Sequence, residues 1–408
     1  MRFPTWLTVL MGLLSFMASS QAQAMPQCAT ECLSTSLQSS TCSSTDFDCI
    51  CADKTLMSTI QTCVLGSCTI VEGLKAQNAT ATLCHDPVRD KSLIAPIATA
   101  VTGALALALI SLRIYDCVVK KEYRWADLCA VLAFISSLPM DIFEFFMMSS
   151  GMGKDVWTLT PTQITNAVKY TWVTQVFYIP AIILTKVAII CFFMQIFPSF
   201  RFRVVAQATI AHCFLFMIST TIAAILACIP VPYAWSSWSG EGEGVCYNNS
   251  VFWWAHSAIN IATDLWILAM PIPQLLKLQL PLKKKIYLVL MFSVGIVITV
   301  MSIVRFSGLI QYSTSSNATY NNVMVATYSV IECNISIMCC CMPAVLSCLR
   351  RSFPSIFSST SRSYNYNHSP FSDTNGIQKT VVHKVSYMPR AGHSDDAVEL
   401  VDKKNSPW

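Results

Sequence analysis

The sequence predicts an all-α membrane protein: a seven-transmembrane helix bundle preceded by a small, disulfide-rich, helical extracellular domain. Of its 408 residues, 54% are hydrophobic and only 12% are charged, whereas soluble domains carry about 25% charged residues. Seven stretches of the chain are apolar over about 20 residues, the length that a helix needs to cross a bilayer. Eight of the 19 cysteines lie together near the N-terminus, between Cys28 and Cys84.

The first 24 residues have the pattern of a secretory signal peptide. Arg2 gives the positive start, residues 6–17 form the apolar core, and Ala22-Gln23-Ala24 is a small-x-small cleavage site. A first transmembrane helix is the alternative, but the apolar run is too short for one and ends in polar residues. The segment that follows is therefore expected to reach an oxidising compartment, where disulfides form.

Residues 25–90 contain eight cysteines with the spacing C-x3-C-x9-C-x6-C-x-C-x11-C-x4-C-x15-C. So short a segment buries too little apolar surface to be stable alone, so disulfides are expected. A zinc site would need a reducing compartment and C-x-x-C pairs, and the segment has none. One possibility is that two antiparallel helices are bridged in a nested way, because Cys28 and Cys32, and likewise Cys63 and Cys68, lie about one helical turn apart.

The stretches "PQCATEC" and "CSSTDFDCIC", with the later four-residue gap and the last distant cysteine, resemble the CFEM domain of fungal extracellular proteins. The resemblance covers the whole segment and implies a compact helical domain. It also implies haem binding in some members, through an aspartate that corresponds to Asp46. The disulfides it implies are Cys28–Cys68, Cys32–Cys63, Cys42–Cys49 and Cys51–Cys84.

Two roles are open for Asp46. A Cys42–Cys49 bridge would close a tight loop around it and hold its carboxylate beside an apolar surface. A carboxylate is a hard anionic ligand that suits ferric better than ferrous iron, so this position favours redox-sensitive uptake and release of haem. The alternative is a turn or cap residue whose side chain accepts backbone N–H groups.

After Arg89 the composition becomes that of a membrane bundle, followed by a polar tail. The loops expected on the inner side are rich in Lys and Arg, whereas Lys154 stands with Glu241 and Glu243 in the expected outer loops, which places the N-terminus outside the cell and the C-terminus in the cytoplasm. A disordered cytoplasmic tail is expected at 350–408. The predicted spans within residues 92–349 are 92–114, 126–149, 170–197, 205–231, 251–274, 286–310 and 323–348, and the inner bases are Arg113, Lys120, Lys121, Arg124, Arg201, Arg203, Lys277 and Lys283–Lys285.

The expected outer surface carries further signals. The sequons at Asn78, Asn248 and Asn317 fall in outer segments and are predicted glycosylation sites, whereas the sequon at Asn334 lies within the seventh span. Cys228 and Cys246 are expected to pair and hold the long second outer loop, with two free thiols as the alternative. Four cysteines near the inner end of span seven are either palmitoylation sites or small packing residues: Cys339, Cys340, Cys341 and Cys348.

Spans three, five, six and seven each contain one charged residue, namely Lys186, Asp264, Arg305 and Glu332. A charge at mid-bilayer costs about 2.5–3.5 kcal/mol even on the most lenient scale, so the four are expected to form a buried network of two cations and two anions. The network either fixes helix packing or is a switch that ligand binding rearranges. A proton or ion path is a third possibility.

The spans carry a second resemblance. The stretches "GMGKDVW", "LTKVAIICFFMQIFP", "ATDLWILAMPIP", "KKKIYLVLMFSVG" and "IVRF" together resemble the fungal rhodopsin-like integral membrane family. A CFEM domain followed by such a bundle implies a receptor-like seven-helix protein. Span seven contains no lysine, so no Schiff base to retinal is expected there. Span three ends in "FPSFRFR" rather than the Asp-Arg-Tyr of animal receptors, so coupling to a G protein rests on the helix count alone.

These observations favour a receptor-like plasma-membrane sensor. Its outer domain would capture a hydrophobic or haem-like ligand or contact a surface, and its inner loops and tail would meet a cytoplasmic signalling protein. The first alternative is a haem-binding or haem-uptake protein with Asp46 as axial ligand, and the second is a transporter that uses Lys186, Asp264 and Glu332. The sequence shows no catalytic constellation, phosphate-binding loop or nucleic-acid-binding pattern, so neither an enzyme nor a nucleic-acid partner is expected.

Overall fold

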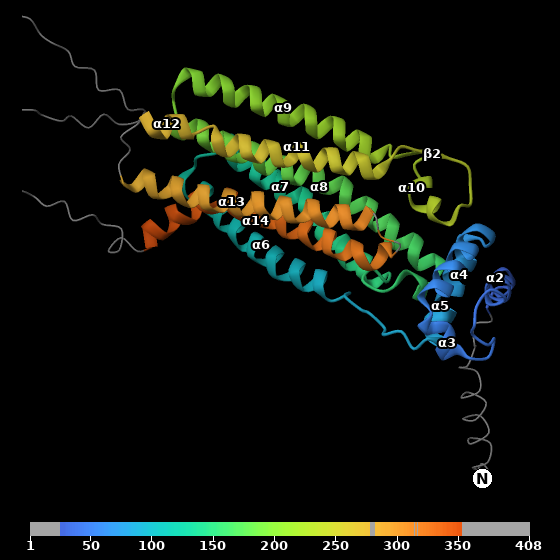
Figure 1. Ribbon diagram of the computed structural model, residues 1–408. Coiled ribbons are helices and arrows are strands. Elements are labelled where there is room, and N and C mark those ends of the chain that lie inside the picture. Colours follow the sequence, from blue (N-terminus) through green and yellow to red (C-terminus); the bar gives the residue numbers. More distant parts are fainter. Residues whose placement is uncertain (1–24, 278–281, 314, 316, 353–408) are drawn as a thin grey trace, which may run out of the picture. The chain divides into compact units, whose positions relative to one another are not determined.

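The computed structural model describes residues 25–277, 282–313, 315 and 317–352. Within them, helices account for most of the chain, and one short pair of strands joins them. The signal peptide expected at 1–24 and nearly all of the tail expected at 350–408 lie outside the described residues. Two parts follow one another along the chain, a small set of short helices and then a bundle of long ones (Figure 1).

The head, residues 25–90, contains four helices: α2 (Gln27–Leu37), α3 (Phe47–Ala52), α4 (Lys54–Ser67) and α5 (Ile70–Leu83). Local sequence sets three of their N-termini, because short polar side chains there accept the N–H groups that the first helical turn leaves free. Asp46 caps α3, and Asp53 caps α4. Thr69 and Glu72 form a capping box at the start of α5.

Disulfides hold these short helices together. The structure contains the bridges Cys28–Cys68 and Cys32–Cys63 between α2 and the end of α4, as well as Cys42–Cys49 and Cys51–Cys84. The buried hydrophobic residues of the head are few and mostly small: Ala29, Cys32, Ile50, Leu56 and Ala76. A core of this size cannot stabilise a fold alone, so the cross-links supply what hydrophobic burial does not.

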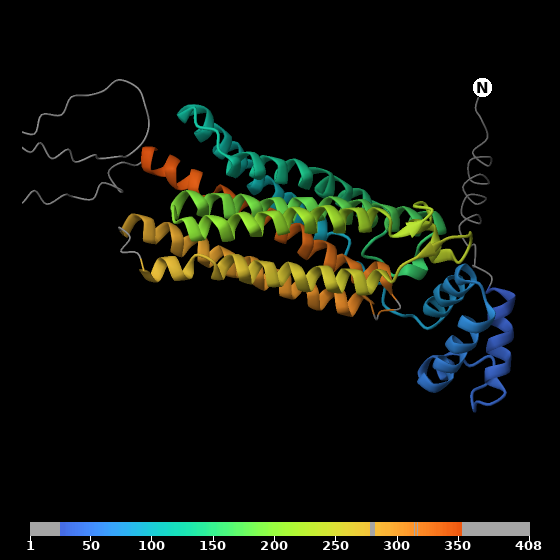
Figure 2. The same cartoon turned by 90° about the horizontal axis from the view of Figure 1, so that it is seen from above.

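The bundle follows with α6 (Ile94–Lys120), α7 (Trp125–Ser149), α8 (Pro161–Ile196), α9 (Phe200–Ile225), α11 (Asn249–Ala269), the short α12 (Ile272–Lys277), α13 (Leu282–Ser313) and α14 (Ala318–Ser352). The long helices lie side by side (Figures 1 and 2). Helix α8 packs against α7, α9, α11 and α14, and 67% of its most apolar window is buried, so it forms the centre of the bundle. We call the end at which α6, α8, α11 and α14 begin the head-side end, and the opposite one the tail-side end.

Six of the described helices are long and apolar enough to cross a membrane: α6, α7, α8, α9, residues 295–313 of α13, and α14. Helix α11 falls in the fifth predicted span, 251–274, but is not among these six. Three polar side chains on it, those of His256, Asn260 and Asp264, are buried inside the bundle. These polar side chains lower the mean hydropathy of α11, but they face the interior of the bundle and not the lipid. That α11 crosses the membrane therefore stays a prediction.

Helix boundaries differ from the predicted spans at two places. Helix α8 begins at Pro161, well before the predicted residue 170, because Thr160 and Gln163 form a capping box there. Helix α6 continues to Lys120, so Arg113 lies within a helix and not in the predicted inner loop. The Arg113 side chain is buried, where it pairs with Asp127 of α7 at 2.5 Å.

Helix α14 contains Pro343, which has no N–H to donate to the preceding turn. The guanidinium of Arg113 donates to the backbone carbonyl of Cys340, three residues before this proline. This hydrogen bond therefore joins the tail-side part of α6 to the turn of α14 that the proline interrupts.

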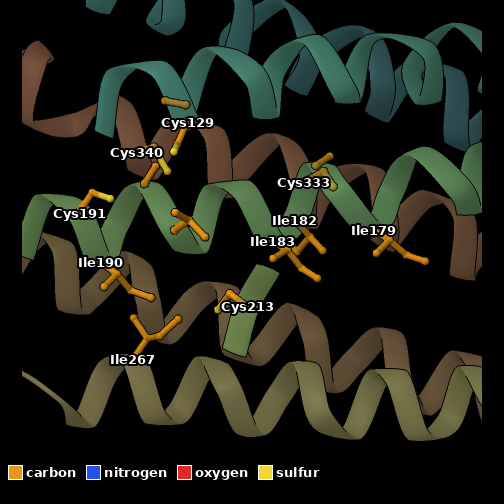
Figure 3. Close-up of a cluster of buried hydrophobic side chains, with 14 of the residues drawn as sticks. Cys129, Ile179, Ile182, Ile183, Ile190, Cys191, Cys213, Ile267, Cys333 and Cys340 are labelled. Atoms are coloured by element: carbon orange, nitrogen blue, oxygen red, sulfur yellow. The ribbon is translucent and has the colours of Figure 1, made fainter. Parts of the chain in front are cut away.

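The bundle core is built of branched aliphatic side chains and thiols (Figure 3). Ile179, Ile182, Ile183 and Ile190 of α8 are all almost completely buried. Around them lie Cys129, Cys191, Cys213, Cys333 and Cys340.

The cysteines of the predicted palmitoylation cluster differ in exposure. Cys339, Cys340 and Cys341 are buried, whereas Cys348 is half-buried. Of the two roles considered, packing therefore describes the first three.

The connection between α9 and α11 holds the only described strands, β1 (Cys228–Ile229) and β2 (Val245–Cys246), which pair antiparallel. A disulfide joins Cys228 to Cys246 across this pair. Helix α10 (Tyr233–Ser236) and the 3₁₀ turn η2 (Ser237–Ser239) fill the loop between them, and a further 3₁₀ turn, η1 (Val156–Thr158), precedes α8.

Candidate functional sites in the head and the bundle

The head has an apolar hollow of about 1140 Å³. Its lining comes largely from α3, α4, α5 and the segment after them. It includes the five large hydrophobic side chains that are exposed within residues 25–90: Phe47, Leu65, Ile70, Leu83 and Val88. Exposed apolar surface gathered around one hollow is typical of a ligand site, and ligand pockets commonly measure about 300–1,000 Å³. The hollow is thus large enough for a sizeable hydrophobic molecule.

Asp46 lies in the loop closed by Cys42–Cys49, at the start of α3. Its carboxylate is exposed, and Oδ1 accepts a hydrogen bond from the Cys49 N–H at 3.1 Å. The neighbouring Phe47 lines the hollow, whereas Asp46 itself does not. The side chain therefore has the capping role considered for it, while its second oxygen makes no hydrogen bond within the described residues.

This arrangement fits haem, because an exposed carboxylate that could serve as the oxygen ligand of the iron lies beside an apolar hollow. Asp46 would be the ligand of the iron, and Phe47 would form part of the apolar surface against the haem. Haem, when bound, would supply a redox-active iron. Among the described residues, no group of three or more His, Cys, Asp or Glu side chains is placed to hold a bare metal ion.

The four predicted charges of the bundle come together in two ion pairs. Lys186 Nζ lies 2.8 Å from Asp264 Oδ1. Arg305 Nη1 lies 3.9 Å from Glu332 Oε2. All four residues are at most 7% exposed. The sequence predicted these residues as one buried network, and the structure brings α8, α11, α13 and α14 together through them.

Polar side chains link the two ion pairs into one network. Ser302 donates either to Asp264 Oδ2 at 3.3 Å or to Glu332 Oε1, and Asn260 Nδ2 donates to the same Glu332 oxygen at 3.3 Å. The Asn260 backbone carbonyl also accepts a hydrogen bond from Lys186 Nζ at 2.8 Å. A rearrangement of one pair must therefore change the hydrogen bonds of the other.

Tyr178 connects the network to the head-side part of α8. Arg305 Nη1 donates to the Tyr178 hydroxyl at 2.7 Å, and the guanidinium carbon lies 4.1 Å from the tyrosine ring centroid, so a cation–π contact adds to the hydrogen bond. The hydroxyl lies 3.0 Å from Glu332 Oε2, to which it donates. Arg305 Nε also donates to Ser329 at 2.8 Å. The arginine is thus held from several sides.

Sequence reasoning missed Tyr178, Ser302 and His256. Tyr178 precedes Lys186 by about two helical turns, and Ser302 precedes Arg305 by one, so helical spacing from a known charge is the signal that would have found them. His256 is buried, and both ring nitrogens lack partners within the described residues. Its ring stacks on Phe216 at 5.3 Å.

Lys186 does not fit a retinal site. Its ammonium group is occupied by Asp264 and by the Asn260 carbonyl. It also does not line the bundle cavity that contains Tyr178 and Arg305. Helix α14, which contains the seventh predicted span, has no lysine. We therefore derive no step through a Schiff base.

A second polar cluster lies at the head-side end, centred on Asp155. This carboxylate is 3% exposed and accepts hydrogen bonds from Arg89 Nη2 at 2.7 Å and from Asn317 Nδ2 at 2.6 Å. Asn317 Oδ1 in turn accepts from the Val156 N–H at 3.1 Å. The cluster joins the segment after α5 to the loops before α8 and α14.

This geometry bears on the predicted glycosylation sites. A glycan on Asn317 would be attached to Nδ2, the atom that donates to Asp155, and the residue is only 7% exposed. The sequon is present, but the Asn317 side-chain nitrogen is buried in the folded structure. Asn248 is exposed and caps α11 through its side-chain oxygen. Asn78 lies in α5 and is half-buried. Glycosylation of Asn78 and Asn248 stays a prediction.

The apolar helices and the disulfide-bonded head define a multi-pass membrane protein with a cystine-rich N-terminal domain. Comparison with known families agrees with this class. The fungal rhodopsin domain matches residues 112–351, and the CFEM domain matches residues 21–85. The chain belongs to the fungal rhodopsin domain family and carries a CFEM domain in front of it, as the resemblances in the sequence predicted.

Three known proteins are similar to parts of the chain. A SAT4 family membrane protein of Emericella nidulans is 26% identical over 242 residues, 58% of this chain and 60% of that protein. Receptor GIN3 of Arthrobotrys oligospora is 30% identical over 101 residues, 25% of each chain. Satratoxin biosynthesis SC1 cluster protein 4 of Stachybotrys chartarum is 26% identical over 125 residues, 31% of this chain and 44% of that protein. The chain thus spans at most 60% of the length of these relatives.

Proposed function

We propose that the protein is a receptor-like sensor of the plasma membrane. The head lies outside the cell and captures a hydrophobic or haem-like molecule or contacts a surface, and the bundle passes the event to a cytoplasmic signalling protein. The observation that carries the proposal is the hollow of the head, around which its exposed large hydrophobic side chains gather. The partial similarity to a protein named as a receptor supports the same role. The proposal assigns no catalytic step to the chain.

Two polar clusters provide a route for the signal. The hydrogen bonds from Arg89 and Asn317 to Asp155 tie the last residues of the head to the start of α14 at the head-side end. Farther along α14, Glu332 belongs to the network of ion pairs. A shift of α14 therefore changes the contacts of Arg305, Ser302 and Tyr178, and the network is the element with alternative pairings that a switch requires.

The test uses the full chain in lipid nanodiscs, with a fluorophore on Cys348 near the tail-side end and Cys117 replaced by serine. Binding of the hydrophobic probe 1-anilinonaphthalene-8-sulfonate to the head is expected to change the label's emission. Leu65→Ser, on the rim of the hollow, should weaken probe binding and the emission change together, while Leu215→Ser on the exposed face of α9 is the matched control. Binding without any emission change would show that the head does not communicate with the bundle.

A second candidate function is haem binding by the head, favoured by the exposed Asp46 carboxylate beside Phe47. Titration of the full chain with ferric haem is expected to give a Soret shift that Asp46→Ala abolishes. Asp48→Ala is the matched control, because it removes a nearby exposed carboxylate of α3. Equal shifts in all three proteins would remove Asp46 as the ligand.

Transport is the remaining alternative for the ion pairs of the bundle. Asp264→Asn should abolish a downstream messenger response in cells if the network acts as a switch. Loss of solute flux through the reconstituted protein, without a change in the messenger response, would favour a transporter over the proposed sensor.

A further inference from the structure

A second cavity, of about 60 Å³, lies inside the bundle near its head-side end. Its lining begins at Asn249 and Ser250 in the first turn of α11 and reaches the buried residues Glu144, Tyr178 and Arg305. A single water molecule needs about 10–15 Å³ measured in this way. The cavity therefore has room for a few waters or a small organic group, and it is far too small for haem.

Glu144 is the unbalanced charge of this cavity. It is 1% exposed, and its Oε1 has no hydrogen-bond partner among the described residues. Asp141, one turn earlier on α7, receives a hydrogen bond from the Asn334 amide at 3.4 Å, and the described part of the chain forms no ion pair with it. The buried cations of the network are already paired, Lys186 with Asp264 and Arg305 with Glu332.

A buried carboxylate without a partner is strongly unfavourable, so Glu144 requires either a proton or a positively charged group. The other walls of the cavity favour the positively charged group. Trp253 and Tyr312 contribute aromatic rings, whose faces attract cations, and Trp253 is itself buried. A carboxylate combined with aromatic walls is the arrangement that recognises an ammonium group.

Arg305 also lines the cavity, and its charge would repel a cation. Its guanidinium is turned to other partners, however. Nη1 donates to the Tyr178 hydroxyl at 2.7 Å and lies 3.9 Å from Glu332, and Nε donates to Ser329. The charge of Arg305 is thus balanced inside the network, whereas that of Glu144 is not.

We propose that this cavity binds the ammonium group of a small organic cation, with the Glu144 carboxylate as its counter-ion. The site is reached from the head-side end, past the first turn of α11. Because it lies next to Tyr178 and Arg305, its occupant would bias the same ion pairs that we assign to signalling. The inference does not require the head to bind any ligand, so it can fail or hold independently of the proposed sensor function.

The test is thermal unfolding of the full chain in nanodiscs, titrated with ethylammonium and tetramethylammonium chloride. A saturable rise of the unfolding midpoint is expected for at least one of these ions. Sodium chloride at equal concentration and tert-butyl alcohol, an uncharged molecule of similar shape to tetramethylammonium, should give none. An equal rise with sodium chloride would indicate an inorganic cation or a salt effect, and an equal rise with the alcohol would indicate apolar binding. Either result would overturn the proposal.

Glu144→Gln keeps the size of the side chain and removes its charge. It should reduce the apparent affinity for the ammonium ions roughly tenfold or more, since both ions lose the attraction of the carboxylate charge and ethylammonium also loses a charge-assisted hydrogen bond. Glu243→Gln, an exposed carboxylate in the loop before α11, should leave the affinity unchanged. No saturable rise with either ammonium ion in the wild-type protein would mean that Glu144 is simply protonated. That result overturns the proposal even if the variant fails to fold.

Discussion

Removing one partner of the Lys186–Asp264 pair should destabilise the bundle far more than removing a surface charge. Asp264→Asn keeps the shape of the side chain but leaves a buried ammonium group, 4% exposed, with only uncharged acceptors such as the Asn260 carbonyl beside it. Breaking a buried ion pair from one side costs about 3–5 kcal/mol. For a domain of this size, 1 kcal/mol shifts the unfolding midpoint by about 2–4 °C, so a fall of roughly 6–12 °C or more is expected.

The assay is a thermal melt in nanodiscs, read by tryptophan fluorescence, for four proteins: the wild type, Asp264→Asn, Lys186→Met and the double variant. Because each single change leaves the other charge unpaired, the double variant should lose clearly less than the sum of the two. Glu122→Gln is the control, since its pair with Arg124 is more than half exposed on both sides and such pairs contribute about 0–1 kcal/mol. Additive losses, or a single-variant shift no larger than that of the control, would refute the description of this pair as buried and coupled.

Three further outcomes are expected. Asp155→Asn should lower the unfolding midpoint by a few degrees, because the loss of a charged acceptor costs about 1.5–3 kcal/mol; a melt that matches wild type would contradict the role given to this cluster. Hydrogen bonds from Thr69 lower the pKa of Glu72, so the stability that this carboxylate adds is present above its unfolded pKa of about 4.3 and is lost as the pH falls through its folded pKa. The midpoint difference between wild type and Glu72→Gln should therefore shrink from pH 6 to pH 3, and a constant difference would exclude the effect. In glycosidase digests, Asn248→Gln should remove a glycan and Asn317→Gln should not, and a mass shift for Asn317→Gln would show that its nitrogen is reached before folding.

Patterns with a simple physical cause could be predicted from the sequence. Charges inside apolar spans cannot face lipid, so Lys186, Asp264, Arg305 and Glu332 had to meet one another, and the structure joins them in pairs. The exposed apolar side chains of the head could not be predicted, because a segment with few hydrophobic residues gives no periodic pattern from which to tell buried from exposed positions. Phe47 and Leu65 become recognisable as the wall of a hollow only once the disulfides have arranged their helices.

The remaining differences come from contacts between distant segments. Arg113 follows an uncharged run of span one and therefore looks like the first base of an inner loop. Its side chain instead bonds to Asp127, fourteen residues later, and is buried between α6 and α7. Asn317 carries a valid sequon, but Asp155 occupies its nitrogen from another loop. Glu144 lies in the second predicted span, and a sequence cannot show that such a carboxylate faces a cavity without a partner.

The hydrogen bond from Arg113 to the carbonyl of Cys340 has a mechanical consequence. Pro343 makes this turn of α14 the place where the helix bends most easily, since one rung of its hydrogen-bond ladder is missing. The side chain that bridges the weak turn comes from the first helix after the head. A tilt of that first helix therefore acts on the weak turn of the last one, so the bend of α14 is coupled to the helix that follows the head.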